Sequence, residues 1–405
     1  MLKKIIDYSN KYFNLFDLIS DISDLRANPQ IACSDIAASI MSMLFSNLGS
    51  LNKFNQTRDF SYAGNIAVRI PSASTVARAA DTIDLNYLRE ILKSIYLKAK
   101  RSKMIQPFNG RYIGIIDGHE ICSSDLHRCG LCSVRNVSKI EGVVKLNYHH
   151  RYTAFILAGQ KFAFLLDIEP IYPLEGELTS ALRLLDRVCI NYPKAFEAVA
   201  GDGLYLNGAT FGLLESHHKY TIAVLKDETR ELYAEAMSLS AITAPVVYED
   251  EGIRYRAWDH TISGLWDGYN KPVRAIRSEE TKTVRHHSEE LGKWDVQEER
   301  AEWMWVTNLP SVVGLKNIIS ACHSRWQIEN KCFNEIVSTW NADHVYRHSG
   351  NAISAFLLFL FIALNIFNIF FTRNIKDKRI RSKTLLIDLI KAEYLLARWA
   401  RPIPV

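Results

Sequence analysis

A chain of 405 residues with 48% hydrophobic and 23% charged residues has enough apolar content for a large core. That balance excludes a disordered or low-complexity protein, and the length allows two or three domains. The formal net charge of +5 at pH 7 is mildly basic, which permits a polyanionic partner without requiring one.

Residues 1–106 are predicted to form an all-helical DNA-binding domain. Pro71 is followed by hydroxyl residues and alanines, which is typical of a helix start, and a second helix at 85–100 ends in a basic run. Helix N-termini with hydroxyl groups can dock on DNA phosphates, whereas an ordinary bundle with a solvated basic end is the alternative. The candidate DNA contacts are Ser72, Ser74, Arg78, Lys98, Lys100 and Arg101.

From residue 107 the pattern changes to strands. The β-branched run at 113–116 predicts a buried strand that ends on Asp117, where a glycine follows and the chain turns. A second short apolar run ends in the same way on Asp202. The other elements predicted between these points and residue 225 are a hairpin (148–157 with 162–168), a helix (175–192), a helix (209–216) and a strand (220–225). Residues 107–225 therefore read as the first part of a mixed sheet with flanking helices, in the α/β class.

Residues 226–300 alternate apolar with polar or basic side chains, as exposed antiparallel strands do, and are predicted to form an inserted β-rich subdomain. Residues 301–372 are predicted to form the second part of the α/β core, with a strand at 304–309 and a long helix at 313–340. A basic connector and an amphipathic helix at 385–399 are expected within 373–405.

The stretch at 352–371 is almost wholly apolar and is long enough to span a bilayer. A central helix that is buried on all sides has the same pattern. Because the sequence holds no second such stretch, we interpret it as a core helix and expect no membrane partner.

Three acidic residues form the candidate catalytic site. Asp117, Asp202 and Glu329 offer hard oxygen ligands of the type that suits two Mg²⁺ or Mn²⁺ ions. Arg325 lies four residues before Glu329 in the predicted helix, on the same face, where it can hold a phosphate. Taken singly, an Asp-Gly pair is a common turn and a helical Arg–Glu pair is a common surface ion pair, so the prediction depends on all of them together.

These residues stand in motifs that resemble the DDE transposases of bacterial insertion sequences. The matching segments are Ile-Ile-Asp-Gly-His-Glu at 115–120, Gly-Asp-Gly-Leu-Tyr at 201–205 and Arg-Trp-Gln-Ile-Glu-Asn at 325–330. The resemblance covers about residues 110–370, and the β-rich insertion resembles that of the cut-and-paste branch. It implies a ribonuclease-H-like core, with Asp117, Asp202 and Glu329 as the metal-binding triad.

The resemblance also implies an activity and its partners. The expected function is a transposase that binds the terminal repeats of its mobile element as double-stranded DNA, cleaves them and joins them to target DNA. A homodimer in the DNA complex and a bacterial cytoplasmic location, associated with the nucleoid, are expected with it. A metal-dependent nuclease without strand transfer and a catalytically silent DNA-binding derivative are the alternatives.

Two positions depart from the cut-and-paste branch. That branch has a tyrosine three residues before the arginine, where this chain has Cys322, and a lysine seven residues after the glutamate, where this chain has Ile336. Lys331 is a candidate DNA contact in place of that lysine, although it lies on another helical face. These departures leave open whether a DNA hairpin intermediate forms.

A second metal site is predicted in the loop after Asp117. Cys129-Gly130-Leu131-Cys132 has the spacing of a zinc knuckle, and the candidate ligands of a structural Zn²⁺ are Cys122, His127, Cys129 and Cys132. His149 and His150 are further candidates nearby. Free reduced thiols are the alternative, since the seven cysteines and the absence of a signal-peptide pattern favour a reduced cytosol.

Aromatic residues in basic surroundings are candidate contacts for unpaired bases. Trp258 and Trp266 lie in the predicted insertion and are the candidates for such contacts, and Trp258 is flanked by arginine. Trp305 lies in an apolar strand and is predicted to be a core residue.

Overall fold

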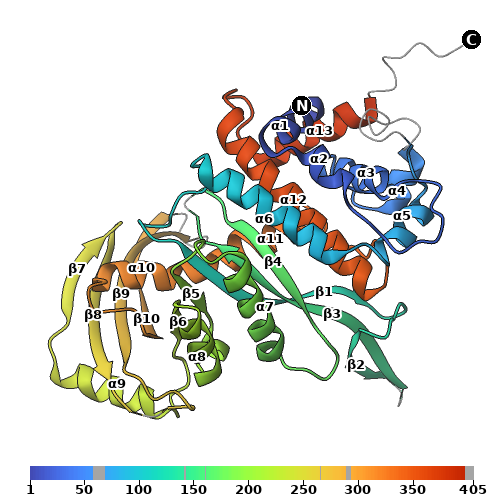
Figure 1. The fold of residues 1–405 in the computed structure, drawn as a ribbon. Coiled ribbons are helices and arrows are strands. Elements are labelled where there is room, and N and C mark those ends of the chain that lie inside the picture. The colour runs from blue at the N-terminus through green and yellow to red at the C-terminus, as the bar shows by residue number, and fades with distance from the viewer. Residues whose placement is uncertain (58–68, 141–142, 160, 265, 289–292, 397–405) are drawn as a thin grey trace, which may run out of the picture. The chain divides into compact units, whose positions relative to one another are not determined.

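The computed structural model describes residues 1–57, 69–140, 143–159, 161–264, 266–288 and 293–396 (Figure 1). The chain folds into two compact units, which we describe one at a time. The first unit holds Met1–Gln106, Gly118–Leu184 and Gln327–Val405, and the second holds Pro107–Asp117 and Leu185–Trp326. Within the described residues, ten strands form a mixed sheet, which confirms the predicted α/β class.

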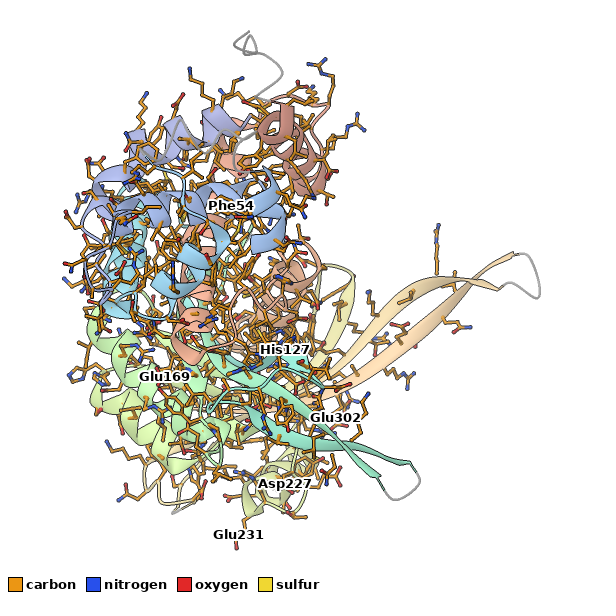
Figure 2. The ribbon with its side chains drawn as sticks, turned by 90° about the vertical axis from the view of Figure 1, so that its right-hand side faces the viewer. Phe54, His127, Glu169, Asp227, Glu231 and Glu302 are labelled. Carbon is orange, nitrogen blue, oxygen red and sulfur yellow. The ribbon has the colours of Figure 1, made fainter. Side chains whose placement is uncertain are left out.

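The N-terminal part of the first unit is helical, as predicted. Its helices are α1 (Leu2–Phe13), α2 (Leu15–Ser20), α3 (Cys33–Phe45), α4 (Leu51–Thr57), α5 (Ala73–Ala80) and α6 (Leu85–Arg101). Phe54 of α4, labelled in Figure 2, is 1% exposed, so even this short helix contributes to a core. Helices α1, α3, α5 and α6 all pack against α12 (Gly350–Asn374), and the first 106 residues therefore share a core with the C-terminal part of the chain (Figure 1).

Helix α12 is the apolar stretch that resembles a membrane span. Its most apolar 18-residue window is entirely buried in the structure, as the core-helix interpretation predicts. Asn365, one of its few polar residues, accepts a hydrogen bond from Leu165 N at 2.9 Å and donates one to Leu165 O at 2.7 Å. Leu165 lies in β4 (Phe164–Ile171), so the asparagine joins the helix to the sheet by satisfying backbone groups.

Three strands of the first unit form an antiparallel set. Strand β3 (Val143–Leu157) pairs with β4 over Arg151–Leu157, which confirms the predicted hairpin. Over Val143–His149 it pairs with β2 (Ser133–Ile140), a strand that the sequence pattern does not predict. Helix α7 (Glu177–Asn191) follows β4 along the chain, and α13 (Lys383–Leu396) lies in the C-terminal part. The predicted end of that last helix, 397–399, lies outside the described residues.

The second unit begins with parallel strands and ends with antiparallel ones. Strand β5 (Ala198–Gly201) pairs in parallel with β1 (Ile113–Ser124) and with β6 (Tyr220–Val224). The antiparallel strands follow in the order β10 (Lys293–Thr307), β9 (Val273–Ser288), β8 (Ile253–Ile262) and β7 (Val246–Asp250). Helices α8 (Gly208–Ser216) and α9 (Glu231–Ile242) supply Phe211, Leu232 and Ala236 to the core on this sheet. Among the described residues of 226–300 strands predominate, as predicted, but helix α9 was not predicted.

Two predicted elements differ from the structure. Strand β1 continues past Asp117 to Ser124, because the long strand β3 is its other neighbour in the sheet and the chain needs no turn where the short β5 stops. The helix predicted at 313–340 is broken into α10 (Leu315–His323), a 3₁₀ turn (Ser324–Trp326), a π-helical segment (Glu329–Phe333) and α11 (Asn334–Ser338). Such irregular turns change the direction in which side chains point, and they often mark functional sites.

Ser72 has a structural role that can be tested directly. Its Oγ accepts a hydrogen bond from Thr75 N at 3.2 Å and so caps α5. Ser72→Ala is expected to lower the free energy of unfolding by about 1 kcal/mol, measured by thermal unfolding. Ser23→Ala is the matched control, because Ser23 is exposed and lies outside α5. Equal losses in the two variants would contradict the assignment of the cap.

Candidate functional site

Asp117 and Asp202 stand at equivalent positions on neighbouring parallel strands of the second unit. The pairing of β1 with β5 aligns Ile115 with Ala200. Asp117 comes two residues later within β1, and Asp202 comes two residues later, directly after β5 ends at Gly201. Neighbouring strands lie about 4.8 Å apart, and residues two apart share a face of the sheet. The register therefore directs both carboxylates to the same face at the same level.

The turn after β5 is shaped around Asp202. A Cβ on Gly201 would lie 2.5 Å from the Tyr205 ring, so only glycine permits this packing before the aspartate. Asp202 Oδ1 accepts a hydrogen bond from Leu204 N at 2.8 Å and caps the 3₁₀ turn Gly203–Tyr205. The backbone N–H of Leu204 therefore holds the Asp202 carboxylate in place, which suits a metal ligand on a rigid scaffold.

Arg325 lies next to Asp117 in the second unit. Its Nη1 is 3.5 Å from Asp117 Oδ2, and the side chains are only 11% and 17% exposed. A cavity of about 80 Å³ lies beside this arginine, between strands β6 and β10 and the end of α10. Its lining is aromatic and basic: Lys226, Trp303, Trp305, His323, Arg325 and Trp326, with Val224 and Cys322.

Glu329 belongs to the first unit, where it begins the π-helical segment. In the same segment, Lys331 donates a hydrogen bond to Gly159 O at 3.1 Å, and burial lowers the pKa of its amine. The regular helix predicted to place Arg325 and Glu329 on one face is interrupted between them. Among the described residues, no group of three acidic side chains converges into a magnesium site, so that site stays a prediction.

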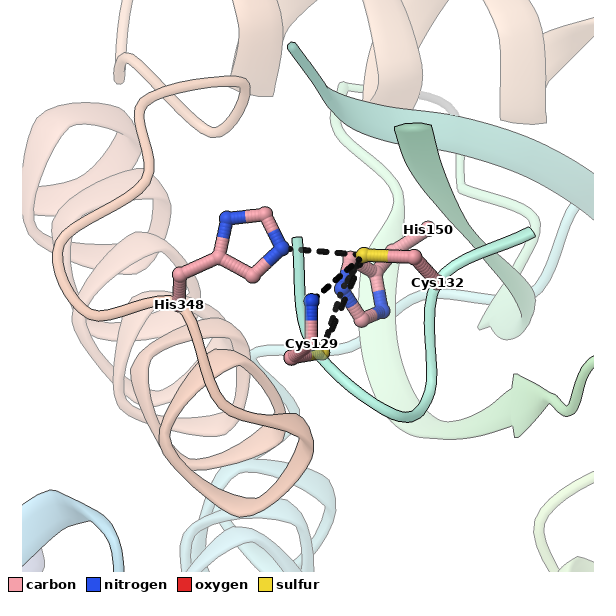
Figure 3. Close-up of side chains that lie close together, drawn as sticks. All are labelled: Cys129, Cys132, His150 and His348. Atoms are coloured by element: carbon pink, nitrogen blue, oxygen red, sulfur yellow. Dashed lines mark hydrogen bonds between the residues drawn. The ribbon is translucent and has the colours of Figure 1, made fainter. Parts of the chain in front are cut away.

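The first unit contains a cluster of two cysteines and two histidines that can hold a metal such as zinc (Figure 3). Cys129 Sγ and Cys132 Sγ are 3.8 Å apart, and His150 Nε2 lies 3.4 Å from each of them. His348 Nε2 lies 3.0 Å from Cys132 Sγ. All four ligand atoms are within 4.8 Å of one another.

Two of the four zinc ligands predicted from the sequence belong to this cluster. Cys129 and Cys132 belong to the cluster, but Cys122 and His127 (labelled in Figure 2) do not, and His150 and His348 take their places. Cys122 is 2% exposed in strand β1, and burial raises the pKa of its thiol to about 12. The other sequence candidate, His149, lies 3.7 Å from Glu120 rather than in the cluster.

Burial dominates the protonation of the cluster. It lowers the pKa of His150 to about 4, assisted by His348 and His149 nearby, and it raises the pKa of Cys132 to about 11. Without a metal, the histidine is therefore neutral and the thiol protonated at pH 7. Neutral imidazole is the form of histidine that binds metal.

The predicted DNA contacts differ in accessibility. Ser74, Arg78 and Arg101 are exposed, whereas Lys98 donates a hydrogen bond to Phe13 O at 2.8 Å. Trp258, a predicted base contact, is instead 5% exposed, and its Nε1 donates to Thr243 O. Arg277 lies 4.6 Å over its ring, so this buried tryptophan is removed from the candidate base contacts.

Comparisons of the chain with protein-family models and with curated proteins gave no match. The functional argument therefore depends on the residues themselves and on their placement within each unit.

Proposed function

We propose that the protein is a DNA transposase of the DDE type, which binds the ends of its mobile element and catalyses metal-dependent phosphodiester cleavage and strand transfer. The observation that carries the proposal is the parallel register of β1 and β5, which aligns Ile115 with Ala200 and so brings Asp117 and Asp202, each two residues later, to the same level. Carboxylates so placed can share divalent cations, and the motifs around them are those that resemble the transposases.

Asp117, Asp202 and Glu329 are the proposed ligands of two Mg²⁺ or Mn²⁺ ions. When bound, such a pair of ions supplies an activated water or 3′-hydroxyl and stabilises the leaving oxygen of a phosphodiester. Asp202 is fixed by its bond to Leu204 N, which reduces the freedom that a ligand loses on binding. Glu329 enters the proposal through its motif and its carboxylate chemistry.

Arg325 is proposed to orient both a ligand and the substrate. Its Nη1 lies near the Asp117 carboxylate, and a guanidinium has further N–H groups that suit a phosphate. The adjoining cavity, with three tryptophans and Lys226, offers flat apolar faces and positive charge together. That combination suits an unpaired nucleotide next to the phosphate that Arg325 holds.

A single reaction series tests the proposal against its alternatives. The full-length protein is incubated with DNA that carries both element ends and their flanks, together with a target plasmid and Mg²⁺. Cleavage at the ends followed by joined products is the expected result. Cleavage without joining would favour the nuclease alternative, and binding without cleavage would favour the silent derivative.

DNA binding is expected to depend on exposed basic residues of the helical part. Because the first 106 residues share a core with α12, point changes in the full chain are better probes than a truncation. The double variant Arg78→Gln with Arg101→Gln is expected to weaken DNA binding. It should also reduce the slope of log K against log salt concentration by about two, which is about one for each lost phosphate contact. Binding is measured by fluorescence anisotropy from low to high salt.

The control for this variant is Lys4→Gln, which removes an exposed positive charge from α1. It is expected to leave the salt dependence unchanged. An unchanged slope in the double variant would remove both arginines from the DNA interface.

A further inference from the structure

The Cys/His cluster draws on three separate segments of the first unit. Cys129 and Cys132 come from the loop between β1 and β2, His150 comes from β3, and His348 comes from the segment just before α12 (Figure 3). His348 is 216 residues beyond Cys132 in the chain. The cluster therefore depends on the tertiary fold rather than on one local motif.

The fold brings each ligand into place. Strands β2 and β3 pair Ser133 with His149, and this antiparallel register places Cys132, one residue earlier, beside His150, one residue later. Cys129 N donates to Cys132 Sγ at 3.2 Å, and such a bond favours a thiolate. His348 is flanked by Arg347 and Ser349, and both bond to the Asp81 carboxylate at the end of α5.

The distances fit a tetrahedral zinc ion. With Zn–S of about 2.3 Å and Zn–N of about 2.0 Å, a tetrahedron has edges of about 3.8 Å between two sulfurs and about 3.5 Å between sulfur and nitrogen. The observed sulfur–sulfur distance is 3.8 Å, and three of the four sulfur–nitrogen distances are 3.4, 3.4 and 3.0 Å. All four atoms lie within 4.8 Å of one another. Two thiolates and two imidazoles are a set that selects zinc over hard cations such as Mg²⁺.

We propose that Cys129, Cys132, His150 and His348 bind one structural Zn²⁺, which fastens the loop after β1 to the start of α12. The loop already packs closely there, because a Cβ on Gly350 would lie 2.1 Å from Leu131 Cδ1. The four protein ligands close the coordination shell, which is typical of a structural site and leaves no position for a substrate. This proposal is independent of the proposed DNA chemistry.

The two ring nitrogens of His348 have different surroundings. Its Nδ1 is buried and has no hydrogen-bond partner among the described residues. Its Nε2 is directed at Cys132 Sγ. A metal on Nε2 would supply the binding free energy that orders this ring.

The test is the zinc content of full-length protein purified under reducing conditions without chelator. About one zinc per chain is expected by elemental analysis, and Co²⁺ in its place should show the visible ligand-field bands of tetrahedral thiolate coordination. Removing zinc with a strong chelator should lower the unfolding temperature, since metal binding is linked to folding. Protein without zinc, or with a Cys129–Cys132 disulfide in its place, would overturn the proposal.

Two histidine variants test the ligand set. His348→Ala should lose most of the zinc, whereas His127→Ala should keep it, although His127 lies nearby, with its ring 6.5 Å from that of His348. The opposite pattern would overturn the assignment in favour of the set predicted from sequence. His348→Cys retains a zinc ligand and should retain zinc, and it carries the test if His348→Ala does not fold.

Discussion

Asp117→Asn and Asp202→Asn are each expected to reduce strand cleavage by roughly 10³-fold or more while DNA binding stays close to that of the wild type. The amide keeps the size of each side chain but removes the negative charge that a divalent cation requires. Asp202→Asn also keeps an oxygen that can accept the bond from Leu204 N, so the turn is expected to survive. Glu329→Gln is expected to have the same effect on cleavage.

The controls are the same chemical changes at acids outside the candidate site. Asp227→Asn and Glu231→Gln, both labelled in Figure 2, remove exposed charges of the second unit and should leave cleavage unchanged. Cleavage is measured on end-labelled DNA in Mg²⁺, with binding measured in parallel. Near wild-type cleavage by any of the three site variants would remove that residue from the active site.

The second large effect concerns the two asparagines of α12. Asn365→Leu is expected to lower the free energy of unfolding by about 2–4 kcal/mol, because both backbone groups of Leu165 would lose their partner inside the core. Asn368→Leu should be close to neutral, because Asn368 Oδ1 is already buried without a hydrogen-bond partner among the described residues. Thermal and urea unfolding of the full chain measure both.

This pair of variants compares the same substitution three residues apart on one helix. Equal losses would mean that the size of the side chain decides the effect rather than its hydrogen bonds. A stabilised Asn365→Leu would contradict the role given to that residue in joining α12 to β4.

Local pattern predicted the elements that bury an apolar face. Elements with a continuous or periodic apolar pattern could be predicted from the sequence. They are the strands before Asp117 and Asp202, the β3–β4 hairpin and the buried helix α12. Strand β2 was missed because Ser133–Ile140 is mostly polar and depends on pairing with β3. The break near Arg325 was missed because residues 315–338 contain no proline or glycine that would mark it.

The candidate site residues could likewise be predicted only where their pattern is local in the sequence. The knuckle of Cys129 and Cys132 was found because its spacing is local, but His348 carries no signal that connects it to a loop more than 200 residues earlier. The charged residues around Trp258 in the sequence suggest exposure, yet this side chain is buried, with Arg256, and Arg277 of the paired strand, packed on its ring. Tertiary contacts determine both the position of His348 and the burial of Trp258, and such contacts leave no local pattern in a single sequence.

The central claim is that Asp117 and Asp202 bind the divalent metal used for DNA cleavage, and a change of ligand tests it most directly. Asp202→Cys replaces a hard oxygen ligand by a softer sulfur, which suits Mn²⁺ better than Mg²⁺. We expect this variant to be inactive in Mg²⁺ and to recover part of its cleavage of the element ends in Mn²⁺, with wild-type protein active in both. Cleavage by the variant in Mg²⁺ at the wild-type rate would contradict the account.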